Sequence, residues 1–210
     1  MPLDDRSEEI YMPEEDTYLL LRAALAEAGH GDKTLEIGCG SGLISRELIA
    51  RVECLLATDI NPYAAKLTKT GGIEVVRADL FGGISGKFDL IIFNPPYLPT
   101  QREERTLGWI NFALDGGKTG RETIDRFLKE LKERLRSGGR ALLLISSLTG
   151  PKEVREKAMA EGLDVKEVAN ERCFFEQLLV LRLEVAHSVN GRSTSLQRSM
   201  PIQTINKNNK

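Results

Sequence analysis

One stretch of the chain indicates the fold, Thr34-Leu35-Glu36-Ile37-Gly38-Cys39-Gly40-Ser41-Gly42. Its first four residues have the character of a short buried strand, and Leu43 to Ala50 has the apolar spacing of an amphipathic helix. The glycines at alternate positions between them let the backbone adopt positive φ and approach a ligand closely. We therefore expect a strand, a ligand-binding turn and a helix in succession.

Apolar runs alternate with amphipathic segments along most of the 210 residues. This alternation predicts an α/β fold of one Rossmann-like domain, with a mostly parallel sheet wrapped by helices. We expect strands at 34–37, 54–58, 73–77, 88–93, 140–146, 163–169 and about 175–184, the last two joined as a hairpin. We expect helices at 17–28, 43–50, 62–69, 120–136 and 151–161.

The strand after the glycine turn ends on Asp59, 21 residues beyond Gly38. Nucleotide-binding folds place an acidic residue at about this distance, where it holds the ribose hydroxyls. Two features disfavour NAD or FAD: Leu43 stands where the dinucleotide motif needs a small residue, and Glu36 would repel a pyrophosphate. Both features suit a ligand with a ribose, a cationic centre and no phosphate.

A second motif, Asn94-Pro95-Pro96-Tyr97, directly follows the apolar run from Leu90 to Phe93. The prolines remove two backbone donors and fix φ, so carbonyls beside Asn94 point into a cavity at the strand end. These acceptors would hold a planar amino group, either a carboxamide or the exocyclic amine of a base, and Tyr97 could stack on it. The alternative is a proline-capped strand end followed by a loop.

Polar side chains follow four of the expected strands at or just beyond their carboxyl ends: Glu36, Asp59, Asp79 and Asn94. In open α/β sheets ligands bind at these ends, so the four side chains should converge on one crevice. Capping of neighbouring loops is the alternative, plausible for Asp79 alone.

Composition narrows the class of protein. The net charge of −2 shows no basic excess, which disfavours nucleic-acid binding. The three cysteines are scattered and there are only two histidines, so we expect neither disulfides nor a metal site. Without a signal peptide or an apolar span of transmembrane length, we expect a cytoplasmic protein that does not enter the membrane.

Three regions differ from the expected domain, which covers residues 10–185. Residues 1–9 are polar and expected to be flexible, and the polar, basic stretch 186–210 has the composition of a disordered tail. Residues 98–119 form a long segment after the motif at Asn94, and such loops are usually functional or mobile. We expect Trp109 and Phe112 within it to pack on the core, with lining of a substrate pocket as the alternative.

Beyond the two loops, further segments match one family. Tyr11 to Thr17, Asp59-Ile60-Asn61-Pro62, Ala78-Asp79-Leu80 and the stretch Ala113 to Phe127 are similar to segments of the HemK/PrmC-type protein-glutamine methyltransferases. These belong to the class I S-adenosylmethionine-dependent methyltransferases, and the resemblance spans roughly Ile10 to Leu183. It implies the seven-stranded methyltransferase fold with an antiparallel last strand.

The resemblance, together with charge, assigns roles to residues of the expected crevice. Gly38, Cys39 and Gly40 would pass under the methionine part of S-adenosyl-L-methionine, Asp59 would hold its ribose, and Asp79 with Leu80 would contact adenine. Glu36 would lie near the cationic portion, and Thr17 belongs to the same shell by resemblance. Asn94 and the Pro95 carbonyl would accept both N–H bonds of a substrate amide beside Tyr97, directing its nitrogen toward the sulfonium methyl.

The resembled branch also implies partners. Its substrate is the glutamine of the Gly-Gly-Gln loop of the class 1 translation release factor, and a small zinc-binding activator covers an apolar sheet edge, here Ile73 to Val76. An adenine-N6 methyltransferase acting on DNA or RNA is the competing interpretation, since the motif at Asn94 accepts an exocyclic amine equally well. Lysine methylation as a side activity and a non-catalytic cofactor-binding scaffold stay open.

Overall fold

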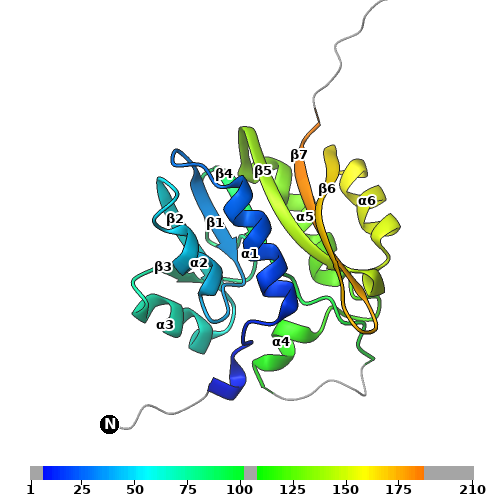
Figure 1. Cartoon of the computed structure of the whole chain (residues 1–210), viewed down its shortest axis with the longest axis horizontal. Helices are drawn as coiled ribbons and strands as arrows, with labels where there is room; N and C mark the ends of the chain where they lie inside the picture. The colour runs from blue at the N-terminus through cyan, green and yellow to red at the C-terminus, as the bar shows by residue number, and fades with distance from the viewer. Residues whose placement is uncertain (1–6, 102–107, 187–210) are drawn as a thin grey trace, which may run out of the picture.

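In the computed structural model, which describes residues 7–101 and 108–186, a seven-stranded sheet lies between helices (Figure 1). The strands are β1 (Lys33–Ile37), β2 (Cys54–Asp59), β3 (Glu74–Arg77), β4 (Phe88–Phe93), β5 (Leu135–Ser146), β6 (Leu163–Arg172) and β7 (Gln177–Val185). The helices are α1 (Glu15–Glu27), α2 (Leu43–Leu48), α3 (Pro62–Thr70), α4 (Ile110–Leu114), α5 (Glu122–Arg134) and α6 (Pro151–Ala160). Two 3-10 turns, η1 (Ser7–Glu9) and η3 (Ser147–Thr149), complete the elements used below.

The strand order is β3-β2-β1-β4-β5-β7-β6. Neighbouring strands from β3 to β5 are parallel, whereas β7 runs antiparallel to both β5 and β6. This confirms the mostly parallel α/β sheet with an antiparallel last strand, and it places β3 at an edge. The order reverses between β1 and β4, which is where ligands bind in open α/β sheets.

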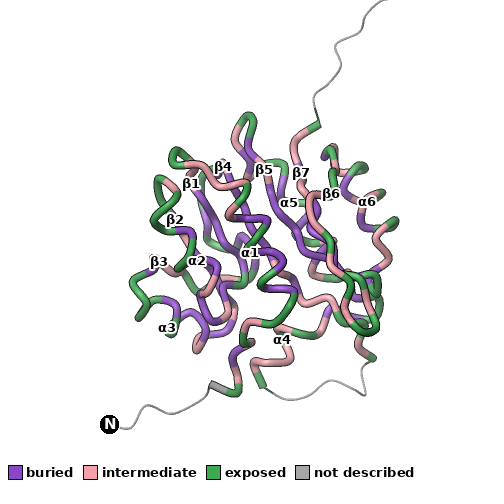
Figure 2. Tube along the Cα trace, viewed as in Figure 1, coloured by how far each residue is buried: buried purple, intermediate pink, exposed green. Residues whose placement is uncertain are grey.

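Alternate residues of the central strands pack into two separate cores, because successive strand side chains point to opposite faces. Leu90 and Ile92 of β4 join the cluster beneath α1 and α2, while Ile91 and Phe93 join the cluster beneath α5 and α6. In β5, Leu142 joins the cluster beneath α1 and α2, and Ala141 joins the cluster beneath α5 and α6. Figure 2 shows the buried trace concentrated in these strands and in the inner faces of the helices.

The expected elements all occur, with shifts at their ends. The largest shift is in β5, which begins at Leu135 instead of 140, because Leu135 already pairs with Phe88 before the register changes at Leu90. Segment 98–119, expected without regular structure, contains the short helix α4. Residues 1–6, 102–107 and 187–210 lie outside the described part. With them lie most of the N-terminus expected to be flexible at 1–9 and almost all of the tail expected at 186–210. Among the described residues, no helix has both the length and the apolar character needed to cross a membrane.

Candidate functional site

A cavity of about 740 Å³ opens at the carboxyl ends of the parallel strands, beside the reversal between β1 and β4. Its volume lies in the range of roughly 300–1,000 Å³ that is usual for small-molecule sites. Every site residue expected from the sequence lines it: Thr17, Glu36, Gly38, Cys39, Gly40, Asp59, Asp79, Leu80, Asn94, Pro95 and Tyr97. The structure therefore brings the two sequence motifs and the strand-end carboxylates together, as predicted.

The glycine turn after β1 is fixed by its neighbours. The N–H of Cys39 donates to the Thr58 carbonyl at 2.9 Å, and the Thr68 hydroxyl donates to the Gly40 carbonyl at 3.2 Å. Gly42 has a φ of +79°, and a Cβ there would lie 2.6 Å from the Thr68 hydroxyl oxygen. Only glycine therefore allows α3 to pack this closely on the turn.

Asp59, the last residue of β2, is oriented by backbone donors. Its carboxylate accepts from the N–H of Gly40 and the N–H of Asn61, each at 2.8 Å. Asn61 then caps α3 by accepting from the Tyr63 N–H at 2.9 Å. Burial raises the pKa of Asp59, although the two backbone donors oppose this shift. The remaining lone pairs of this fixed carboxylate are available to a ligand in the cavity.

Glu36 is buried at the end of β1, where 2% of its surface is exposed. Burial raises its pKa from 4.5 to about 8, against a hydrogen bond donated by the Ser45 hydroxyl. The nearby charge of Asp59 also raises this pKa, and that of Arg46 lowers it. A cation in the cavity would favour the ionised form of Glu36.

The Asp79–Leu80 turn is strained. Leu80 has a φ of +50°. Residues other than glycine rarely adopt this left-handed backbone conformation, which costs them roughly 1–2 kcal/mol. The turn is held by the Gly82 N–H, which donates to the Asp79 carbonyl at 2.9 Å. The Asp79 carboxylate is half-exposed and forms an ion pair with Arg126 at 2.7 Å. Strained residues that persist in folded proteins cluster at ligand sites, which supports a binding role for this turn.

Asn94 lies directly beyond β4, and its amide is oriented by Asp16 of α1. The Asn94 Nδ2 group donates to Asp16 Oδ2 at 3.1 Å. A carboxylate only accepts, so the amide nitrogen must face it and Oδ1 must point elsewhere. Asn94 Oδ1 is buried and has no hydrogen-bond partner within the described part of the chain. Such an atom costs about 1–3 kcal/mol unless a ligand or water supplies the donor.

Two tyrosines donate to the same oxygen of Asp16 as Asn94 does. The Tyr11 hydroxyl donates to Asp16 Oδ2 at 3.0 Å and the Tyr97 hydroxyl at 3.3 Å. Burial, together with the charge of Asp16, raises the pKa of both hydroxyls, so each keeps its proton to donate. The Tyr97 ring, expected to stack on a bound group, lines the cavity while its hydroxyl is tied to Asp16.

Comparison with protein families decides the class. The model of the methyltransferase small domain matches residues 14–175, most of the chain. The chain belongs to this methyltransferase family. A putative protein N5-glutamine methyltransferase of Methanocaldococcus jannaschii is 44% identical over 180 residues, covering 82% of this chain and 90% of the relative. The mouse methyltransferase HEMK2 is 35% identical, covering 83% of this chain and 89% of the relative.

A solved structure agrees with the family assignment. The chain matches one from the E. cuniculi Mtq2–Trm112 complex, described as responsible for methylating the eRF1 translation termination factor, with a TM-score of 0.71. The two chains are 29% identical, and the match covers 85% of this chain and 99% of the other.

Sequence reasoning on this methyltransferase missed Asp16 as a site residue. Glu14, Glu15 and Asp16 form an acidic run at the start of a helix, where acidic side chains are common. One signal was available: Asp16 shares its helix face with Leu20 and Ala23, four and seven residues on, so it faces the interior. It is 3% exposed, whereas its two acidic neighbours are exposed.

Trp109 and Phe112 line the cavity and belong to neither core cluster, so the expectation that both pack on the core was wrong. Phe112 is 53% exposed and lies against Trp109, with 5.3 Å between ring centroids. The Arg77 guanidinium lies over the Trp109 ring at 5.3 Å. The Glu9 carboxylate in η1 accepts a hydrogen bond from the Trp109 N–H. The Glu9 backbone carbonyl accepts one from Asn61 Nδ2 at 2.7 Å. The N-terminal turn therefore ties the rim near α4 to the Asp59 loop.

The lining of the cavity is strongly acidic. Among the described residues, seven acidic side chains line it and one cation, Arg126, which Asp79 already pairs. The acidic side chains are Glu14, Asp16, Glu36, Asp59, Asp79, Asp115 and Glu176. No group of three or more His, Cys, Asp or Glu in the described ranges has the arrangement of a metal site. The lining disfavours phosphates and favours ligands that carry positive charge.

Proposed function

We propose that this chain transfers a methyl group from S-adenosyl-L-methionine to the side-chain nitrogen of a glutamine, in the Gly-Gly-Gln loop of a class 1 translation release factor. The observation that carries the proposal is the buried Asn94 Oδ1, which has no hydrogen-bond partner among the described residues and is held in its orientation by Asp16. An acceptor fixed in this way at a cavity is suited to an amide N–H. The names of the archaeal relative and of the Mtq2–Trm112 complex support the same substrate class.

The residues present fit S-adenosyl-L-methionine. This cofactor carries a ribose and a sulfonium and no phosphate, and it supplies an electrophilic methyl group when bound. Asp59 would accept from the ribose hydroxyls, with its carboxylate already aligned by the N–H groups of Gly40 and Asn61. The turn from Gly38 to Gly40 would hold the methionine part together with Thr17, and Asp79 with Leu80 would border the adenine. The acidic lining would stabilise the positive charge, with Glu36 nearest to it.

Asn94 and Pro95 would position the acceptor. A glutamine amide nitrogen is a poor nucleophile, because its lone pair is delocalised into the carbonyl. Asn94 Oδ1 and the Pro95 carbonyl would each accept one of its hydrogens, which orients the nitrogen and stabilises the positive charge that develops on it. Asp16 contributes by preventing the Asn94 amide from turning over, and Tyr97 borders the same space.

Adenine methylation is the competing function, since an exocyclic amine would fit the same two acceptors. The acidic lining disfavours it, because nucleic-acid sites gather Lys and Arg around the phosphates. The lining would tolerate a lysine ammonium, so protein-lysine methylation belongs among the outcomes of the test.

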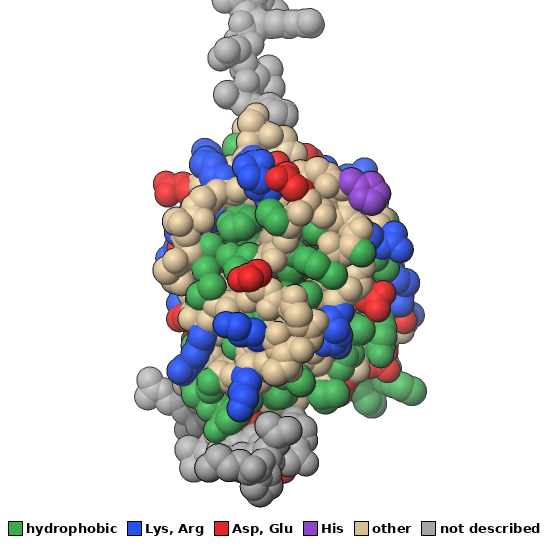
Figure 3. All heavy atoms as spheres, turned by 90° about the vertical axis from the view of Figure 1, so that its left-hand side faces the viewer, with side chains coloured by type: hydrophobic (Ala, Val, Ile, Leu, Met, Phe, Trp, Pro, Cys, Tyr) green, Lys and Arg blue, Asp and Glu red, His purple; other side chains and the backbone are tan. Residues whose placement is uncertain are grey.

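We also infer that a small zinc-binding activator subunit covers the edge of the sheet at β3. Val76 of this strand is 40% exposed, and Leu67 of the contacting helix α3 is 42% exposed. Figure 3 shows several groups of hydrophobic side chains on this face, with an acidic side chain among them and Lys and Arg around them. An apolar edge strand with unpaired backbone groups invites pairing with another chain. The matched Mtq2 structure was solved with a second subunit, Trm112.

The proposal is tested by transfer of a radiolabelled methyl group from S-adenosyl-L-methionine, with and without the activator. The acceptors are the cognate release factor, the same factor with the loop glutamine replaced by alanine, a DNA duplex and a structured RNA. We expect label in the native factor alone. Label in nucleic acid, or equal label in the two forms of the factor, would contradict the proposal.

A further inference from the structure

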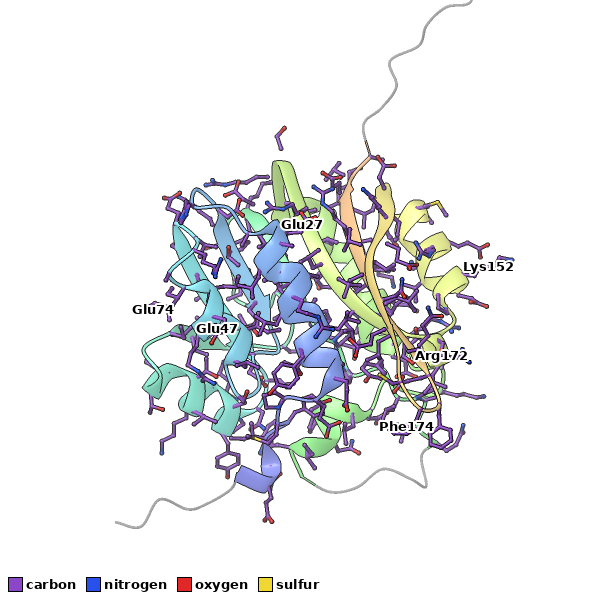
Figure 4. The ribbon with its side chains drawn as sticks, in the orientation of Figure 1. Glu27, Glu47, Glu74, Lys152, Arg172 and Phe174 are labelled. Atoms are coloured by element: carbon purple, nitrogen blue, oxygen red, sulfur yellow. The ribbon has the colours of Figure 1, made fainter. Side chains whose placement is uncertain are left out.

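The tip of the β6–β7 hairpin exposes two aromatic side chains completely. Phe174 is 99% exposed and Phe175 is 98% exposed, and Figure 4 shows Phe174 at the hairpin end, directed away from the ribbon. Burying a phenylalanine side chain stabilises a fold by roughly 1.5–3 kcal/mol, and neither residue provides this. Their presence therefore needs a reason outside the packing of the domain.

Turn chemistry does not supply that reason. The two phenylalanines form a two-residue loop, closed by the N–H of Cys173 on the Glu176 carbonyl at 2.9 Å. Two-residue hairpin loops favour Gly, Asn and Asp, which adopt positive φ at little cost. Neither phenylalanine has positive φ, so the loop adopts a less favoured turn type. The two large side chains therefore do not stabilise the turn.

The tip is held firmly on the sheet. The Ser146 hydroxyl at the end of β5 donates to the Glu176 carboxylate, and the Gln177 N–H donates to the Ser147 hydroxyl at 3.0 Å. Beneath the tip, Cys173 packs against the core under α1. An interaction surface on such a support loses little conformational entropy when it binds, which favours affinity.

The tip lies beside the mouth of the catalytic cavity. Glu176, next to Phe175, lines the cavity, and the hairpin end lies at the same end of the molecule as α4 (Figure 1). Four exposed apolar side chains of other segments line the cavity, whereas Phe174 and Phe175 lie outside its lining. We call the whole set the apolar rim, and it consists of Met12, Leu98, Phe112, Leu114, Phe174 and Phe175. An acidic cavity bordered by apolar side chains differs from the basic grooves that receive nucleic acid.

We propose that the apolar rim, with Phe174 and Phe175 as its anchors, docks the folded protein substrate while its glutamine enters the cavity. This role rests on the proposed function and deepens it. The partner should present an apolar patch beside the loop that carries the glutamine, and that loop should be neutral or basic to suit the acidic lining of the cavity. Aromatic side chains, phenylalanine among them, are enriched in the cores of protein interfaces.

The test compares two substrates for one variant. The double variant Phe174→Ser with Phe175→Ser is assayed on the folded release factor and on a short peptide that contains only the glutamine loop. A peptide of this kind would enter the cavity without reaching the tip. We expect KM for the folded factor to rise by about tenfold or more at similar kcat, the effect of losing two aromatic hot spots. The peptide kcat/KM should stay within about twofold, because the cavity itself is unaltered. Met159→Ser is the matched control, since Met159 is 57% exposed on α6 and does not line the cavity.

The other outcomes overturn the docking role. An unchanged KM for the folded factor would show that the tip contacts nothing in the complex. An equal loss with the peptide would show that the phenylalanines shape the cavity instead. A wild-type dimer in sedimentation that the double variant converts to monomers would assign the tip to a second copy of the chain. If the wild-type protein methylates neither substrate, the proposed function fails first and the docking role falls with it.

Discussion

Asn94 and Asp16 are 78 positions apart in the sequence, and the Asn94 Nδ2 group donates to Asp16 Oδ2 at 3.1 Å. The contact joins the end of β4 to the first turn of α1. It fixes the orientation of the Asn94 amide, because the carboxylate only accepts hydrogen bonds. The buried Oδ1 atom is therefore presented as an acceptor before any ligand binds.

Asp16→Asn should reduce methyl transfer while the chain stays folded. The new amide could donate to Asn94 Oδ1, so the Asn94 side chain could turn over and present a donor to the substrate. We expect kcat to fall by roughly 10–10²-fold, within the range for a displaced electrostatic group. Single-turnover kinetics at saturating cofactor would measure this, and an unchanged kcat would show that Asp16 does not position Asn94.

Asn94→Ala should leave cofactor binding nearly intact while methyl transfer falls by about 10²-fold or more, the cost of removing one preorganised polar group. Calorimetry and turnover on the same preparation separate the two effects. If activity survives the substitution, Asn94 only caps the strand and does not position the substrate.

Asp59→Ala should weaken binding of S-adenosyl-L-methionine by about 1–3 kcal/mol, because the ribose hydroxyls would lose a buried acceptor. Asp79→Ala is the matched control: this carboxylate is half-exposed and paired with Arg126, so a smaller effect is expected. Calorimetric Kd values for both variants test the difference. Equal losses would contradict the assignment of the ribose to Asp59.

Glu36 should make the ligand-free protein less stable as pH rises. Its pKa is about 8 in the folded chain against an ordinary 4.5, so between these values the folded state binds more protons than the unfolded state. The stabilising contribution is fully present below 4.5 and is lost as pH rises through about 8. The slope is at most about 1.4 kcal/mol per pH unit for one group.

Glu36→Gln isolates this contribution, since Asp59 titrates in both proteins. Urea unfolding across the pH range should show the wild-type free energy of unfolding falling relative to the variant. Parallel pH curves would show that burial does not hold the proton on Glu36.

Val76→Asp should abolish the increase in activity that the activator gives, while activity measured without the activator stays within about twofold. Val76 is exposed on the edge strand, so a charge there disrupts pairing without entering the core. Val75 is a poorer choice because it packs against the core cluster under α1 and α2. Met159→Asp, on the exposed face of α6, is the control, and co-purification with the activator is the measurement. Retained activation in Val76→Asp would place the partner elsewhere.

Much of the site could be predicted from short sequence patterns. The glycine turn, Asp59 and Asn94 each follow an apolar strand, so their position at the carboxyl edge follows from the strands alone. The edge position of β3 and the antiparallel β7 followed from the family resemblance and were confirmed.

Contacts between distant segments were not predictable from the sequence. Asp16 meets Asn94 only because α1 packs across the sheet, and its interior position is visible only from the spacing to Leu20 and Ala23. The prediction for Trp109 and Phe112 was wrong because apolar residues occur both in a core and in the lining of a pocket, and the sequence does not distinguish the two. The early start of β5 was missed because Gly138 and Gly139 have the character of a turn, yet Leu135 pairs with Phe88 before them.

The position of the transferred methyl group tests the central claim most directly. Tandem mass spectrometry of the release factor, after reaction with isotopically labelled S-adenosyl-L-methionine and the activator, identifies the modified residue and atom. The acceptors at Asn94 and Pro95 predict one methyl group on the side-chain nitrogen of the loop glutamine, formed about 10²-fold or more slowly when Asn94 is alanine. A methyl group on lysine alone, or on the glutamine at equal yield with Asn94→Ala, would contradict the role assigned to these acceptors.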